Sequence, residues 1–218
     1  MIGSLLYATA SRPGIMHAIR LVGRYQAAPK ENHLLAVKRI FRYLKGTTDF
    51  RLWYSKGNNL TLTDYTDADW EGDIDDRKST SGGAFFLGEC LVAWLSRKQS
   101  SVSLSIAEAK YIAAGACCTQ ILWMKQMLED IQAHYNEPIT ILCDSTSAIS
   151  ISKNSVMHSK TKHIPIKYHF IREHVLEKIV KLDHIGTKDQ VVDIFTKPLP
   201  KETFEYLREK LGVINTPQ

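Results

Sequence analysis

The stretch Leu60-Thr61-Leu62-Thr63-Asp64-Tyr65-Thr66-Asp67 decides the fold, because its apolar and polar residues alternate. Such alternation predicts a β-strand with one face toward a core. Asp67 closes the strand, where its side chain can project past the edge of a sheet. A single aspartate at a strand end is more often a turn residue or a helix cap than a functional group. A functional role for Asp67 is therefore supported only if other acidic residues stand at similar places.

Two further aspartates stand at comparable places. Asp144 follows residues 139–143, a short apolar run that predicts a buried strand, and Asp193 falls at the expected first turn of a helix, where the helix dipole favours a carboxylate. We expect Asp67, Asp144 and Asp193 to converge and to ligate metal. Carboxylate oxygens suit Mg²⁺, and two such ions stabilise the attacking and leaving oxygens of a phosphodiester together.

Residues 106–131 predict a long helix, and one of its faces is apolar from Ala113 onward. Lys110 begins that face, so the helical repeat directs it toward the predicted sheet and the carboxylates. Glu108 lies roughly 200° away around the helix and is not expected at the same point. Two interpretations of Lys110 stay open: a positive charge inside the acidic cluster, or a lysine that reaches out to solvent.

The N-terminal part has a different character. Residues 1–57 contain ten Lys or Arg and two acids, so the formal charge of +5 divides into +8 for this part and −3 for the remainder. Residues 1–45 predict helices, and the outer side of the second one is basic. A basic arm indicates a polyanion partner, although a solvated helix face gives the same pattern. The predicted nucleic-acid contacts there are Lys38, Arg39, Arg42 and Lys45.

Composition narrows the class of protein. A hydrophobic fraction of 44% is ample for a core, and no apolar run reaches the roughly 18 residues that span a membrane. The N-terminus lacks the pattern of a secretory signal, and the four cysteines match no zinc-site spacing. We therefore expect an intracellular protein, cytoplasmic or nuclear, with no membrane partner.

The order of elements indicates a mixed α/β fold. The turn-forming residues Lys56-Gly57-Asn58-Asn59 separate a helical segment, 1–56, from a domain at 57–218. From Leu60 the pattern predicts three strands, a helix, a strand, helices, a strand and a final helix.

At this point the motifs resemble a known family, the C-terminal part of copia-type retrotransposon Pol polyproteins. Residues 57–218 are similar to its ribonuclease H domain, and 1–56 to the thumb or connection region of its reverse transcriptase. The resemblance is carried by Ser11-Arg12-Pro13, Ala36-Val37-Lys38-Arg39-Ile40 and the segments 65–70, 76–82, 94–98, 160–164, 169–173 and 193–200.

The resemblance implies a ribonuclease H-like fold, with a five-stranded mixed sheet flanked by helices and a small helical subdomain before it. It also implies hydrolysis of the RNA strand of RNA–DNA hybrids with two Mg²⁺ ions, and catalytic acids at Asp67, position 110, Asp144 and Asp193. The family pattern Glu-Ala-Glu-Tyr here reads Glu108-Ala109-Lys110-Tyr111.

Lys110 therefore predicts impaired cleavage. Asp64 and Pro165 also depart from the family, where Gly and Asp are usual. Two alternatives are a non-catalytic nucleic-acid-binding module and a structural remnant of a decayed element. The expected partners are an RNA–DNA hybrid or other nucleic acid and the rest of the reverse transcriptase. Lys160 and Lys162 are predicted phosphate contacts, with a solvated turn as the alternative.

Overall fold

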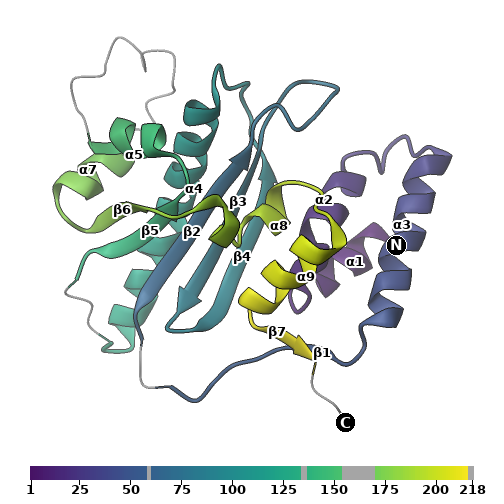
Figure 1. Cartoon of the computed structure of the whole chain (residues 1–218), viewed down its shortest axis with the longest axis horizontal. Helices are drawn as coiled ribbons and strands as arrows, with labels where there is room; N and C mark the ends of the chain where they lie inside the picture. The colour runs from purple at the N-terminus through teal and green to yellow at the C-terminus, as the bar shows by residue number, and fades with distance from the viewer. Residues whose placement is uncertain (58–59, 134–136, 154–169, 216–218) are drawn as a thin grey trace.

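A five-stranded sheet lies at the centre of the molecule (Figure 1). The computed structural model describes residues 1–57, 60–133, 137–153 and 170–215. The strand order is β4-β3-β2-β5-β6, with antiparallel pairing among β2, β3 and β4 and parallel pairing of β2 with β5 and β5 with β6. The predicted mixed sheet is confirmed. Its strands are β2 (Leu62–Asp69), β3 (Thr80–Leu87), β4 (Cys90–Lys98), β5 (Ile139–Cys143) and β6 (Val180–His184).

Helices cover both faces of this sheet (Figure 1). On one side of the sheet, the long helix α4 (Ile106–Asp130) packs on β2 and β3, α5 (Thr146–Lys153) packs on β5 and β6, and α7 (Phe170–Leu176) packs on β6. The short helix α8 (Asp193–Thr196) packs on β2 and β3 from the other side. Its apolar residues form one cluster with the sheet, and those of α4 form a separate cluster. The predicted α/β architecture with flanking helices is therefore present. No helix of the described segments is long and apolar enough to cross a membrane.

Two adjacent glycines let helices approach β3 closely from opposite sides. A Cβ atom on Gly82 would lie 2.5 Å from Val192 Cγ1 and 2.7 Å from Thr196 Cγ2, on the α8 side. A Cβ on Gly83 would lie 2.7 Å from Cys117 Sγ of α4. Real Cβ atoms do not approach other atoms so closely, so only glycine fits at this part of the strand.

The N-terminal part is helical, as predicted, and has an apolar cluster of its own. Its α-helices are α1 (Ile2–Ala8), α2 (Met16–Gly23) and α3 (Glu31–Gly46), with a short 3₁₀ turn at Pro13–Ile15 between the first two. Polar contacts attach this part to the sheet. Arg24 Nη1 lies 2.9 Å from Asp73 Oδ2, and Trp94 Nε1 donates to the Thr9 carbonyl at 3.1 Å.

A second, two-stranded sheet was not predicted. The strand β1 (Phe50–Leu52) pairs antiparallel with β7 (Val213–Asn215), directly after the helix α9 (Lys201–Lys210). The 1–56 segment is thus not purely helical, and it contacts the C-terminal end of the chain. A three-residue strand is too short to show alternation, which explains the omission. The domain boundary at residue 56 stays a prediction.

Candidate active site

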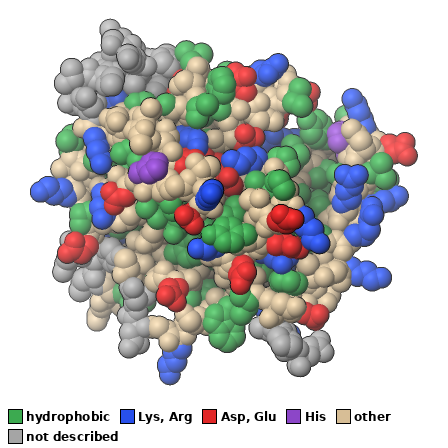
Figure 2. Space-filling model, viewed as in Figure 1, with side chains coloured by type: hydrophobic (Ala, Val, Ile, Leu, Met, Phe, Trp, Pro, Cys, Tyr) green, Lys and Arg blue, Asp and Glu red, His purple; other side chains and the backbone are tan. Residues whose placement is uncertain are grey.

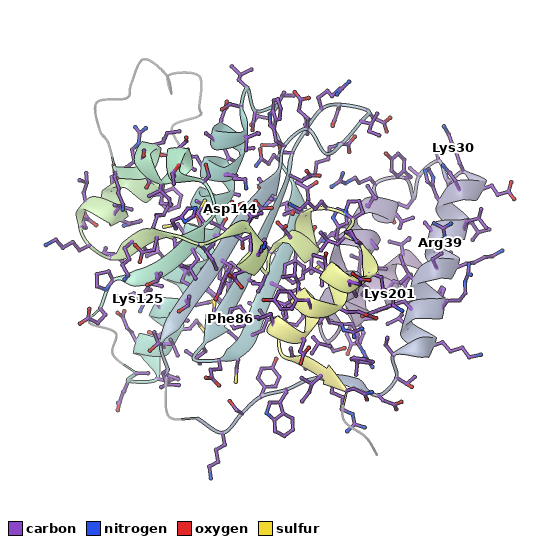
Figure 3. All side chains as sticks on the ribbon, in the orientation of Figure 1. Lys30, Arg39, Phe86, Lys125, Asp144 and Lys201 are labelled. Carbon is purple, nitrogen blue, oxygen red and sulfur yellow. The ribbon has the colours of Figure 1, made fainter. Side chains whose placement is uncertain are left out.

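The topology brings Asp67 and Asp144 together. β2 and β5 are parallel neighbours, and Thr66 of β2 is paired with Cys143 of β5. Asp67 directly follows Thr66, and Asp144 directly follows Cys143. Both carboxylates therefore lie at the same edge of the sheet (Figure 3, where Asp144 is labelled). β2 itself continues to Asp69, so Asp67 lies within the strand rather than closing it.

Lys110 occupies the space between these carboxylates. It lies in the first turns of α4, and its Nζ atom is 2.8 Å from Asp67 Oδ1 and 2.5 Å from Asp144 Oδ1. The three side chains are 13%, 1% and 7% exposed, respectively. The inward direction predicted from the helical repeat is confirmed, and the alternative of a lysine in solvent is wrong.

Asp193 joins the cluster from the opposite face of the sheet. It is the first residue of α8, and Thr196 of the same helix donates from Oγ1 to Asp67 Oδ2 at 2.9 Å. Asp193 Oδ2 is held by Lys197 Nζ at 2.9 Å. Burial, together with the charge of Asp67, raises the pKa of Asp193 to about 6. The close packing of α8 at Gly82 therefore sets where this carboxylate lies.

Glu108 does not join the acidic cluster, as its predicted direction around the helix indicated, and instead forms hydrogen bonds at the start of α4. The Ser105 hydroxyl accepts a hydrogen bond from the Glu108 N–H at 3.2 Å, and Glu108 Oε2 accepts one from the Leu104 N–H at 2.7 Å. Ser105 is the N-cap residue of α4, so these bonds fix the start of the helix. They also fix the direction in which Lys110, half a turn later, leaves the backbone.

The charges in the cluster are strongly coupled. Burial disfavours the charged form of Lys110, but the charge of Asp67 and hydrogen bonds to both aspartates outweigh it and raise its pKa. Burial likewise disfavours ionised Asp67, yet the Lys110 ammonium outweighs this and lowers the pKa of that carboxyl. Lys110 is therefore a cation and Asp67 an anion at neutral pH.

These residues do not fit a Mg²⁺ site as they stand. A metal ion between Asp67 and Asp144 would occupy the position of the Lys110 ammonium, and two cations repel at that distance. Among the described residues, no group of three or more His, Cys, Asp and Glu side chains is placed to hold a metal. The cluster is an internal ion-pair network with a cation already present.

The predicted nucleic-acid contacts lie elsewhere. Lys38, Arg39, Arg42 and Lys45 are exposed on α3, and Figure 2 shows Lys and Arg side chains gathered over this helix. In Figure 3, Arg39 and Asp144 lie in different parts of the molecule. The structure does not bring the α3 residues to the acidic cluster. Lys160 and Lys162 fall outside the described residues.

Sequence reasoning missed two members of the cluster, Lys197 and Thr196. Both stand one helical turn after Asp193, at i+4 and i+3, so the spacing alone makes them neighbours of that carboxylate. The missing information was that α8 presses so closely on the sheet that Thr196 reaches Asp67.

The comparisons with known proteins agree with the motifs. No protein-family model matches the chain. It is 38% identical, over 217 residues, to the retrovirus-related Pol polyprotein from transposon RE2 of Arabidopsis thaliana, covering 100% of this chain and 15% of the relative. It is 42% identical to that from transposon TNT 1-94 of Nicotiana tabacum, covering 97% of this chain and 16% of the relative.

The chain belongs to the copia-type retrotransposon Pol family. It spans roughly a sixth of the length of these Pol polyproteins. Among solved structures, LC11-RNase H1 isolated from compost is similar, with 13% identity and a TM-score of 0.47 over 67% of this chain and 97% of that one.

Proposed function

We propose that this chain binds RNA–DNA hybrids as a ribonuclease H-type domain, and that Lys110 impairs its metal-dependent hydrolysis of the RNA strand. The observation that supports the proposal is the position of the Lys110 ammonium, between Asp67 and Asp144 at hydrogen-bond distance from both. The family resemblance supplies the substrate class and the expectation of Mg²⁺.

The impairment follows from the chemical difference between the Lys110 ammonium and a Mg²⁺ ion. An ammonium neutralises carboxylates, but it cannot coordinate a phosphate oxygen or lower the pKa of a bound water as a metal ion does. A lysine in place of the expected glutamate also removes one metal ligand. The loss of several kcal/mol of transition-state stabilisation lowers a rate by several powers of ten.

The test compares cleavage of a labelled RNA–DNA hybrid in Mg²⁺ by the natural chain and by Lys110→Glu. We expect little cleavage by the former and a gain in the latter. Lys110→Gln is the matched control, since it removes the cation without supplying a carboxylate ligand, and it should gain less. Strong cleavage by the natural chain, or no gain in Lys110→Glu, would contradict the proposal.

A binding assay with the same hybrid addresses the alternatives. A non-catalytic nucleic-acid-binding module binds the hybrid and stays inactive as Lys110→Glu, whereas a structural remnant does neither. Association with the rest of the reverse transcriptase and an intracellular location, cytoplasmic or nuclear, are part of the proposal.

The basic face of α3 gives a second prediction for binding. Replacing Lys38, Arg39 and Arg42 with Gln should weaken hybrid binding and reduce its dependence on salt, because fewer counterions are released from the phosphates. The measurement is affinity over a salt series. Equal slopes for the variant and the natural chain would show that α3 is only a solvated surface.

A further inference from the structure

The edge strand β4 borders a groove that the acidic cluster does not use. Two hollows, of about 850 and 320 Å³, meet along this strand and share Arg20, Ser96, Arg97 and Lys98 in their linings. The larger extends over α4, past Thr119 and Gln120, and the smaller extends toward α1 and α2. We call the two together the β4 groove.

The β4 groove carries positive charge without acidic residues in its lining. None of the described residues that line it is Asp or Glu. Lys98 is held by Asp73 at 2.6 Å and by Asp76 at 2.8 Å. Arg20 and Arg97 are exposed, and neither makes an ion pair with any residue in the described ranges. Their guanidinium groups are therefore available to an anion.

A buried hydroxyl in the same groove also lacks a partner. Ser96 is 2% exposed, and its Oγ atom has no hydrogen-bond partner within the described parts of the chain. An unsatisfied buried hydroxyl is costly, on the order of 1–3 kcal/mol, unless a ligand or water completes it. It can donate to an anionic oxygen or accept from a polar group of a ligand.

The groove lies close to the acidic cluster. Ser96 of β4 is paired with Gly82 of β3, which is paired with Asp67 of β2, so these three residues form one row across the sheet. Two strand spacings separate Ser96 from Asp67, roughly 10 Å. A polymer that reaches the acidic cluster therefore needs only about 10 Å of further length to reach the β4 groove.

We propose that the β4 groove binds the sugar–phosphate backbone of a nucleic acid, with Arg20 and Arg97 contacting phosphates and Ser96 completing the contact. This proposal rests on the proposed function for its ligand, and adds a second contact surface beside the acidic cluster. Planar guanidinium groups match phosphate geometry, and hydroxyl and amide side chains along the groove suit a polar polymer. An extended peptide added to the β4 edge has no need of this charge.

The experiment measures binding of a fluorescent RNA–DNA hybrid by anisotropy over a KCl series. The test variant carries Arg20→Gln and Arg97→Gln. The control carries Arg51→Gln and Arg77→Gln, two exposed arginines outside the groove, and so has the same net charge. We expect the groove variant to lose about tenfold or more in affinity and to have a log–log salt slope shallower by about 2, relative to the control.

The outcomes separate the two proposals. A natural chain that is folded but does not bind the hybrid overturns both. A groove variant that binds like the control overturns the β4 groove alone and leaves an edge-strand peptide as the remaining occupant, while cleavage by Lys110→Glu still tests the proposed function. Circular dichroism of all four forms, natural, groove, control and Lys110→Glu, establishes that each is folded.

Discussion

Lys110 places a permanent positive charge among carboxylates that would otherwise repel one another. Its side chain is 13% exposed, and Asp67 and Asp144 are more deeply buried still. Removing one member of such a network leaves uncompensated buried charge, which costs more than the pair itself contributes. The residue that we propose to impair hydrolysis is therefore also one whose removal destabilises the fold.

We predict that Lys110→Met lowers the free energy of unfolding by about 3 kcal/mol, as measured by urea denaturation. Lys125→Met, which removes a surface i,i+4 pair with Glu129, should change it by less than about 1 kcal/mol. Millimolar Mg²⁺ should stabilise Lys110→Glu and leave the natural chain unchanged. Mg²⁺-dependent stabilisation of the natural chain would mean that the metal binds despite the ammonium.

Asp64 is the second unusual residue, fully buried in β2 where the family usually has Gly. Burial raises the pKa of its carboxyl well above the usual value. The folded state therefore keeps a proton that the unfolded state releases above about pH 4, and stability falls as pH rises from there toward the folded pKa.

We predict that Asp64→Asn flattens this dependence, because the amide has no proton to lose. The natural chain should lose up to about 1.4 kcal/mol of unfolding free energy per pH unit in that window, and the variant clearly less. Asp183→Asn, on the exposed side of β6, should keep the natural slope. Parallel pH profiles for Asp64→Asn and the natural chain would refute the assignment.

At the scale of elements, the close packing of the short helix α8 on the sheet depends on Gly82 of β3. Gly82→Ala should push Val192 and Thr196 away from β3 and lower stability by about 1–3 kcal/mol. It should also weaken the Thr196–Asp67 hydrogen bond and so disturb Asp193. Gly186→Ala is the control, because a Cβ there has no atom within 4 Å. Thermal unfolding of both variants measures the difference, and equal melting temperatures would contradict it.

How much the sequence predicts also depends on the element. The alternation of apolar and polar residues predicted β2, and the helical repeat predicted the inward direction of Lys110. Both patterns are local and several residues long, so they can be recognised in the sequence. β1 and β7 were missed because three residues show no period. The contact of Thr196 with Asp67 could not be predicted, because it depends on how closely α8 packs on β3. The five-stranded mixed sheet was implied by the family resemblance and not by periodicity, and its strand order was not predicted.

At the scale of the whole molecule, a charged network attaches the N-terminal helices to the sheet. Arg24 from just after α2 and Lys98 from β4 both contact Asp73, whose side chain is 3% exposed. Burial disfavours the ionised carboxyl, but the Lys98 hydrogen bond and the two cations outweigh it and lower the pKa of Asp73. Its stabilisation is therefore present above the ordinary aspartate pKa and is lost as pH falls through the folded value.

We predict that Asp73→Asn loosens this attachment, because it leaves two cations facing each other without the anion. The expected result is a loss of about 2–3 kcal/mol in unfolding free energy at neutral pH and faster proteolysis between α2 and α3. Asp76→Asn, whose side chain is 38% exposed, should have a smaller effect. Unchanged proteolysis in Asp73→Asn would show that apolar packing alone holds the helices in place.

The pairing of β1 with β7 has a consequence for how the protein is made. Phe50 pairs with Asn215, and the Arg208 guanidinium lies 3.9 Å from the centre of the Phe50 ring. A ribosome delivers Phe50 long before Arg208 and Asn215, so β1 remains an uncovered edge until β7 has been synthesised. A nascent chain that stalls before Val213 would expose this edge and its aromatic ring, and would be more prone to aggregation than a chain that contains β7. β7 thus covers the edge of β1, the strand that directly follows the N-terminal helices.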